Sequence, residues 1–85
     1  MPSIISEQLL FVTPQDVKDF WAITNTLPRN VDVSVCHGKY EASGKSMLGI
    51  FGLDLSEPVT MKLSFPDTVV FDSKKFLDSV ARWCV

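Results

Sequence analysis

Two segments alternate between apolar and polar residues, and this alternation constrains the fold more than any other feature of the sequence. In residues 30–36 the valines occupy every second position, and in residues 59–65 the apolar positions are Val59, Met61, Leu63 and Phe65. Successive side chains of a strand point to opposite faces of its sheet, so each segment predicts a strand with one buried face. Such strands suit a sheet that is covered by helices on one side only.

Three segments carry the signals of helices. Thr13 can cap the first, Pro14 suits its first position, and Asp16 lies in the first turn, where the helix dipole favours a negative charge. The residues that recur at helical spacing before Pro28 ends this helix are Val17, Phe20, Trp21, Thr24 and Leu27. A short second helix is predicted at residues 46–53. Asp72 or Ser73 caps a third, whose apolar stripe is Phe76, Leu77, Val80, Ala81 and Cys84.

Two further strands complete the predicted fold. An apolar run at residues 8–12 predicts a buried strand, and residues 39–42 form a hairpin with 30–36 through a turn at His37-Gly38. The resulting order, βαββαβα, predicts an α+β fold with a four-stranded, mostly antiparallel sheet and all three helices on one face. We expect residues 1–85 to form a single domain. Water should meet the other face of the sheet, with Asp32, Ser34, Thr60 and Lys62.

Charge and composition exclude several classes of function. The net charge is −2 and the eight basic residues are scattered, which argues against nucleic acid as a partner. No apolar run is long enough to span a membrane, and the N-terminus does not resemble a secretory signal, so we expect a cytoplasmic protein. Cys36 and Cys84 are predicted to be reduced, partly buried thiols, with a disulfide as the alternative. A single histidine predicts no metal site, and no cofactor is expected.

The tripeptide Gly44-Lys45-Ser46 looks like the end of a phosphate-binding loop. Such a loop needs an earlier glycine, but Lys39 occupies that position, and the chain is too short for a nucleotide-binding α/β domain. Ser46 instead stands where the short helix begins, so its hydroxyl is expected to accept a hydrogen bond from an amide of the first turn, at Leu48 or Gly49. A phosphate on Ser46 would also be tolerated there.

The short helix is apolar nearly all the way round, at Met47, Leu48, Ile50, Phe51 and Leu53. Two interpretations stay open. In one, Leu48, Phe51 and Leu53 are core residues; in the other, Met47 and Ile50 form an apolar patch on which a partner docks. His37 is expected to be a solvated turn residue. Because no nucleophile, base and orienting group can be assembled, we predict no catalytic residues.

Residues 37–63 resemble the HPr phosphocarrier family of the bacterial phosphotransferase system. The resemblance lies in the Gly-Lys turn at residues 38–39, in Lys45-Ser46 opening the short helix, in Met47-Leu48-Gly49, and in the strand that follows. It implies the open-faced β-sandwich of that family. It also implies phosphorylation of Ser46 by an HPr kinase and contacts with that kinase or a transcriptional regulator. The residues implied to bind these partners are Lys45, Met47, Ile50 and Phe51.

The chain departs from that family at the junction before the first helix. HPr proteins carry a phosphorylated histidine and an arginine there, whereas this chain has Thr13, Pro14, Gln15 and Asp16. The absent histidine argues against the first enzyme of the system as a partner. The sequence therefore predicts a non-catalytic regulatory or docking protein with a phosphoserine site. The alternatives are a phosphocarrier that uses another residue, and an interaction module without phosphorylation.

Overall fold

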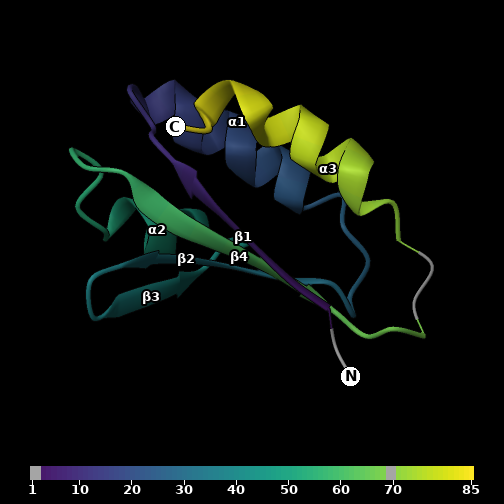
Figure 1. The fold of residues 1–85 in the computed structure, drawn as a ribbon. Helices are drawn as coiled ribbons and strands as arrows, with labels where there is room; N and C mark the ends of the chain where they lie inside the picture. Colours follow the sequence, from purple (N-terminus) through teal and green to yellow (C-terminus); the bar gives the residue numbers. More distant parts are fainter. Residues whose placement is uncertain (1–2, 69–70) are drawn as a thin grey trace.

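The computed structural model describes residues 3–68 and 71–85 and contains one four-stranded antiparallel sheet (Figure 1). Its strands are β1 (Ser3–Leu9), β2 (Asp32–His37), β3 (Tyr40–Ser43) and β4 (Val59–Phe65), in the spatial order β1-β4-β2-β3. The helices are α1 (Pro14–Thr24), α2 (Met47–Phe51) and α3 (Ser73–Val80), with a 3₁₀ turn η1 at Ala81–Trp83. The predicted α+β class, antiparallel sheet and three helices are confirmed.

The strand order interleaves two split β-α-β units. Strand β4 lies between β1 and β2, which α1 connects, and β2 lies between β3 and β4, which α2 connects. In the register, Val33 stands opposite Leu63 and Val35 opposite Met61, while Leu9 faces Val59 on the other side of β4. Paired residues share one face of the sheet, so the apolar positions of three strands combine into one surface.

The apolar face of the sheet and the helices form one core. Val33, Val35, Met61 and Leu63 are all buried, which confirms the face predicted from the alternation. The same core cluster contains a buried residue or more from every helix, among them Phe20 of α1, Ile50 of α2, and Phe76 and Val80 of α3. The helices therefore cover a single face (Figure 1). On the other face Asp32 and Lys62 are exposed, and Ser34 and Thr60 are half-buried.

The first strand begins and ends earlier than predicted. The sequence favoured residues 8–12, but β1 is Ser3–Leu9, because it pairs with the whole of β4. After Leu9 the chain leaves the sheet, and Phe11 packs against Phe20 and Trp83, with ring centroids 5.2 and 5.8 Å away. The apolar run is thus divided between a sheet and an aromatic cluster, which period alone could not separate.

The end of the chain also differs from the prediction. Helix α3 is capped by Asp72 and stops at Val80, where the chain tightens into η1. A 3₁₀ turn rotates successive residues further than an α-helix does. Trp83 is therefore the buried residue of this segment, whereas Ala81 and Cys84 are exposed, which corrects their assignment to the apolar stripe. Cys84 instead forms an isolated antiparallel β-bridge with Leu9, on the edge of β1 that faces away from β4.

The hairpin of β2 and β3 turns one residue later than predicted. Gly38 has φ +60, and among residues 3–68 and 71–85 no non-glycine residue has a positive φ, so Gly38-Lys39 is a two-residue turn with glycine in the first central position. His37 is consequently the last residue of β2, paired with Tyr40 and half-buried, not a solvated turn residue.

Within the described residues, none of the helices is long and apolar enough to cross a membrane.

Candidate protein-docking surface

The Gly-Lys-Ser segment is held against the body of the protein by its backbone. The amide of Gly44 donates to the carbonyl of Val33 at 2.7 Å, and the hydroxyl of Thr24 donates to the carbonyl of Gly44 at 2.8 Å. The indole of Trp21 donates to the carbonyl of Lys45 at 3.1 Å. These bonds connect β2 and α1 to the turn before α2, so the segment is part of the packing of the fold.

Lys45 has a structural role. Its ammonium group donates to the carbonyl oxygens of Val31 at 2.7 Å and Pro28 at 3.1 Å, in the turn between α1 and β2. The Pro28 carbonyl also accepts the Val31 amide at 3.1 Å, so Lys45 adds a second hydrogen bond there and supplies one to the Val31 carbonyl. The resemblance had implied that Lys45 binds a partner. In its structural role, however, the ammonium group has little freedom to do so.

Ser46 caps α2 as predicted. Its backbone is extended, and its hydroxyl oxygen accepts the Gly49 amide at 3.2 Å, so Gly49 rather than Leu48 is the donor. The side chain is exposed. A kinase could therefore reach the hydroxyl once the capping bond opens.

The orientation of α2 reverses the predicted roles of its apolar residues. Ile50 is fully buried in the core, so its assignment to a partner-binding patch is wrong. Met47 is half-buried. Leu48, which was expected in the core, is 86% exposed. Phe51 was expected in the core from its pattern and at a partner-binding position from the resemblance, and it is 39% exposed. The reason is that α2 packs on α1 and β3, which lie on the side of the helix where Ile50 projects.

A shallow groove runs from the start of α1 to the end of α2. It has a volume of about 320 Å³ and is lined by Phe11, Val12, Thr13, Pro14, Phe51, Leu55 and Ser56. Val12 is 78% exposed at its rim. Leu48 precedes Phe51 by three residues and so neighbours it on the helix surface. We call this groove, together with Val12, Leu48 and Phe51, the docking surface.

The residues that precede α1 are engaged with one another. Thr13 and Asp16 form a capping box, in which the Thr13 hydroxyl accepts the Asp16 amide and the Asp16 carboxylate accepts the amides of Val12 and Thr13. The Trp83 indole and these two amides hold the pKa of the Asp16 carboxyl below its usual range. Gln15 donates to Asp19 at 3.0 Å, and Pro14 occupies the first helical position. The amides of Val12, Thr13 and Asp16 at this helix start are thus hydrogen-bonded within the chain.

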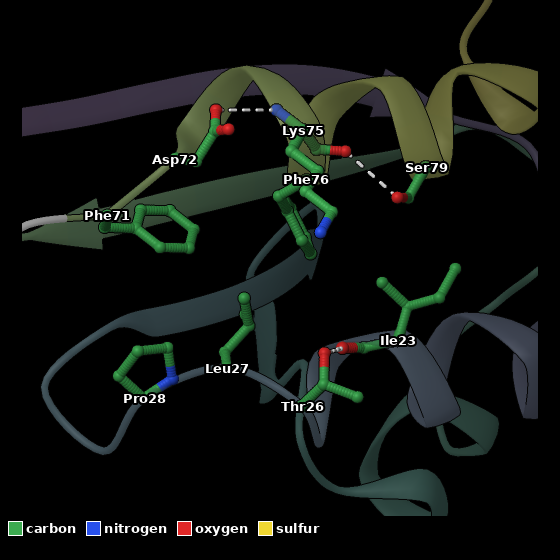
Figure 2. A pocket seen from close by; sticks show the side chains of 9 residues that line it. All are labelled: Ile23, Thr26, Leu27, Pro28, Phe71, Asp72, Lys75, Phe76 and Ser79. Atoms are coloured by element: carbon green, nitrogen blue, oxygen red, sulfur yellow. Dashed lines mark hydrogen bonds between the residues drawn. The ribbon is translucent and has the colours of Figure 1, made fainter.

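A second hollow lies between the end of α1 and the start of α3, and it was not foreseen from the sequence (Figure 2). It has a volume of about 210 Å³ and apolar walls from Ile23, Leu27, Pro28, Phe71 and Phe76. Two hydroxyl groups lie at its rim. The Thr26 hydroxyl donates to the carbonyl oxygen of Ile23, and the Ser79 hydroxyl donates to the carbonyl oxygen of Lys75 (Figure 2). Ile23 of α1 and Phe76 of α3 supply two of its walls, and the segments that follow α1 and precede α3 supply the others.

Both cysteines are free thiols, as expected, and neither has the low pKa of a reactive cysteine. Burial raises the pKa of Cys36, and so does the Glu41 carboxylate, to which its thiol donates at 3.2 Å. Burial and the charge of Glu7 raise the pKa of Cys84. Cys84 was predicted to be partly buried, but it is exposed.

The comparisons of the chain with protein-family models, with curated proteins and with solved structures find no match.

Proposed function

We propose that this chain is an HPr-like regulatory protein of the bacterial cytoplasm that lacks phosphocarrier activity and acts by docking on a protein partner. Phosphorylation of Ser46 would control the docking. The element order βαββαβα and the residues Lys45 to Gly49 support the HPr-like assignment. By this resemblance, the partner is an HPr kinase or a transcriptional regulator.

The observation that carries the proposal is the exposure of apolar side chains on the docking surface. Leu48 and Val12 are 86% and 78% exposed, beside a groove whose walls are largely apolar. Apolar residues grouped around a groove mark sites where proteins bind one another. Ser46 stands two residues before Leu48, so a phosphate there would add about two negative charges at the rim of this surface. Phosphorylation would thereby change which partner the surface accepts.

The geometry before α1 supports the absence of carrier activity. The place of the phosphorylated histidine in the HPr family is held here by Thr13, whose hydroxyl serves as the helix cap. The Asp16 carboxylate occupies the amides of Val12 and Thr13 and brings a negative charge that repels a phosphoryl group. A phosphoryl group at this position would therefore have to displace a capping box.

Two phosphorylation reactions followed by intact-mass measurement test the proposal. Incubation with ATP and an HPr kinase should add roughly 80 Da, the mass of one phosphate. The Ser46→Asn variant should stay unmodified, and since asparagine also caps helices, this variant keeps the start of α2. Incubation with phosphoenolpyruvate and the first enzyme of the phosphotransferase system should add nothing. An acid-labile phosphate from this second reaction would refute the claim that the chain is not a carrier.

Docking is tested by the rate of the kinase reaction. Leu48→Asp places a charge in the docking surface, and we expect it to lower the rate at least tenfold, by about 1.4 kcal/mol of lost binding. Ile4→Asp is the matched control, because Ile4 is also exposed, at 65%, but lies on β1. Equal rates for both variants would refute the role of the docking surface. No adduct at Ser46 with the kinase would refute regulation by phosphorylation, and an interaction module alone would remain.

A further inference from the structure

Three side chains that bind metals well meet at one end of the sheet. His37 ends β2, and Asp54 and Glu57 lie in the segment between α2 and β4. The His37 Nε2 atom is 3.7 Å from Oε2 of Glu57, and one donor atom of each residue lies within 4.8 Å of the others. The pairing of β2 with β4, which extends to Cys36 and Thr60, brings these residues together from separate parts of the chain.

In this cluster the side chains of Asp54 and His37 are held in place, whereas the side chain of Glu57 can move. Oδ1 of Asp54 accepts the hydroxyl of Ser56 at 2.6 Å and its amide at 3.1 Å, which orients the carboxylate. The His37 side chain is only 25% exposed, at the end of a paired strand. The Glu57 side chain is 66% exposed and so has room to change rotamer.

We propose that His37, Asp54 and Glu57 form a binding site for a divalent transition-metal ion, with Zn²⁺ as the best fit. One imidazole nitrogen and two carboxylate oxygens are ligands that Zn²⁺ accepts, and the two negative charges balance the ion. Bonds of about 2.0–2.2 Å at tetrahedral angles place the ligand atoms roughly 3.3 Å apart. The donor atoms here are somewhat farther apart, within 4.8 Å of one another, and a rotation of the exposed Glu57 side chain would bring its carboxylate closer to the other two ligands. Water would complete the coordination.

The imidazole gives the site its selectivity. Mg²⁺ takes oxygen ligands in a strict octahedron and keeps most of its waters, so a histidine with two side-chain carboxylates suits it poorly. Ser56 acts as a positioning residue, since its hydroxyl and amide fix the Asp54 carboxylate. Ser56 also lines the groove of the docking surface, so a bound ion would fasten one wall of that groove to the end of β2. The metal site does not depend on the proposed function.

Calorimetric titration of the full chain with ZnCl₂, in excess Mg²⁺, tests the site. Cysteine thiolates also bind zinc, so the titration uses the chain with Cys36→Ser and Cys84→Ser. We expect one ion per chain. His37→Ala and Glu57→Gln should each weaken binding roughly tenfold or more, and Ser56→Ala should weaken it by a factor of about ten through its effect on Asp54. The matched control is Asp32→Asn, which removes one negative charge at the far end of β2 and should leave the affinity unchanged.

A nuclear magnetic resonance titration separates this site from binding elsewhere. The chain has a single histidine, so its imidazole nitrogen signals are unambiguous, and Zn²⁺ should shift the Nε2 signal at one equivalent. The amide spectrum of each variant verifies that it is folded. The proposal is overturned if the Nε2 signal does not move, if no heat of binding is detected, or if Asp32→Asn weakens binding as much as Glu57→Gln does.

Discussion

Replacing Gly44 by alanine should strongly destabilise the fold. A Cβ atom at this position would lie 2.4 Å from Cγ1 of Val33, 2.9 Å from its Cβ and 3.1 Å from its carbonyl oxygen. The residues cannot move apart freely, because the Gly44 amide donates to that same carbonyl at 2.7 Å and Val33 is buried. Overpacking costs about 1–3 kcal/mol, and weakening the hydrogen bond adds about 1 kcal/mol.

We therefore expect Gly44→Ala to lower the free energy of unfolding by about 2–4 kcal/mol, out of the roughly 5–15 kcal/mol that holds a typical domain together. In a chain of this size that corresponds to a fall in Tm of about 10–30 °C. Urea unfolding followed by tryptophan fluorescence measures the loss, since Trp83 is buried and Trp21 is half-buried. The control is Gly52→Ala: Gly52 has φ −75 at the end of α2, and the nearest atom to a new Cβ is the Gly49 carbonyl oxygen at 3.3 Å, a far milder contact, so the loss should stay below about 1 kcal/mol.

A second substitution tests the cause. Val33→Ala removes the Cγ1 atom that the new Cβ would strike, so the double variant should be more stable than the sum of the single losses by about 0.5–3 kcal/mol. Strict additivity, or a loss below about 0.5 kcal/mol for Gly44→Ala alone, would refute the steric argument. Gly44 would then be replaceable, and its place in the Gly-Lys-Ser segment would need another explanation.

Three further outcomes follow from the contacts of single side chains. Lys45→Met should lower the free energy of unfolding by about 1–2 kcal/mol in urea, because the Val31 carbonyl loses its charged donor and the Pro28 carbonyl keeps only the Val31 amide; a neutral result would mean that water replaces the ammonium group. The pKa of Asp16 is lowered in the folded chain, so its contribution to stability is present above the ordinary value of 3.8 and is lost as the pH falls through the folded value. The stability gap between the wild type and Asp16→Asn should accordingly narrow in acid, and a gap independent of pH would contradict this. Glu41→Gln should speed alkylation of Cys36 at pH 8, because a carboxylate that raises the thiol pKa is removed; Cys84 in the same sample is the control, and an unchanged Cys36 rate would exclude the effect.

Local patterns in the sequence were enough to predict most of the secondary structure. The alternation in residues 59–65 placed β4 and its buried face, because the period of a strand is two whatever surrounds it. Thr13 and Ser46 were predicted as helix caps, and Asp72 was one of two candidates for the third; each of the three accepts a backbone amide of the first turn. A cap forms within four residues of chain, so the sequence carries the whole interaction.

The strand ends and the roles of α2 depended on contacts between distant segments. Helix α2 has five residues and is apolar nearly all round, so its sequence could not say which side faces the core. Packing against α1 and β3 buried Ile50 and left Leu48 and Phe51 exposed, and this choice created the docking surface.

The metal-binding cluster is likewise a product of the tertiary structure. His37 and Glu57 are twenty positions apart in the sequence, in no motif with metal-ligand spacing, and only the pairing of β2 with β4 brings them together. The sequence by itself determined where the helices and the alternating strands β2 and β4 lie and which residues cap, since those patterns and interactions are short-range, whereas the bounds of β1 came from its pairing with β4. The tertiary structure decided which apolar side chains stay at the surface and which polar ones meet, because that depends on how the elements pack.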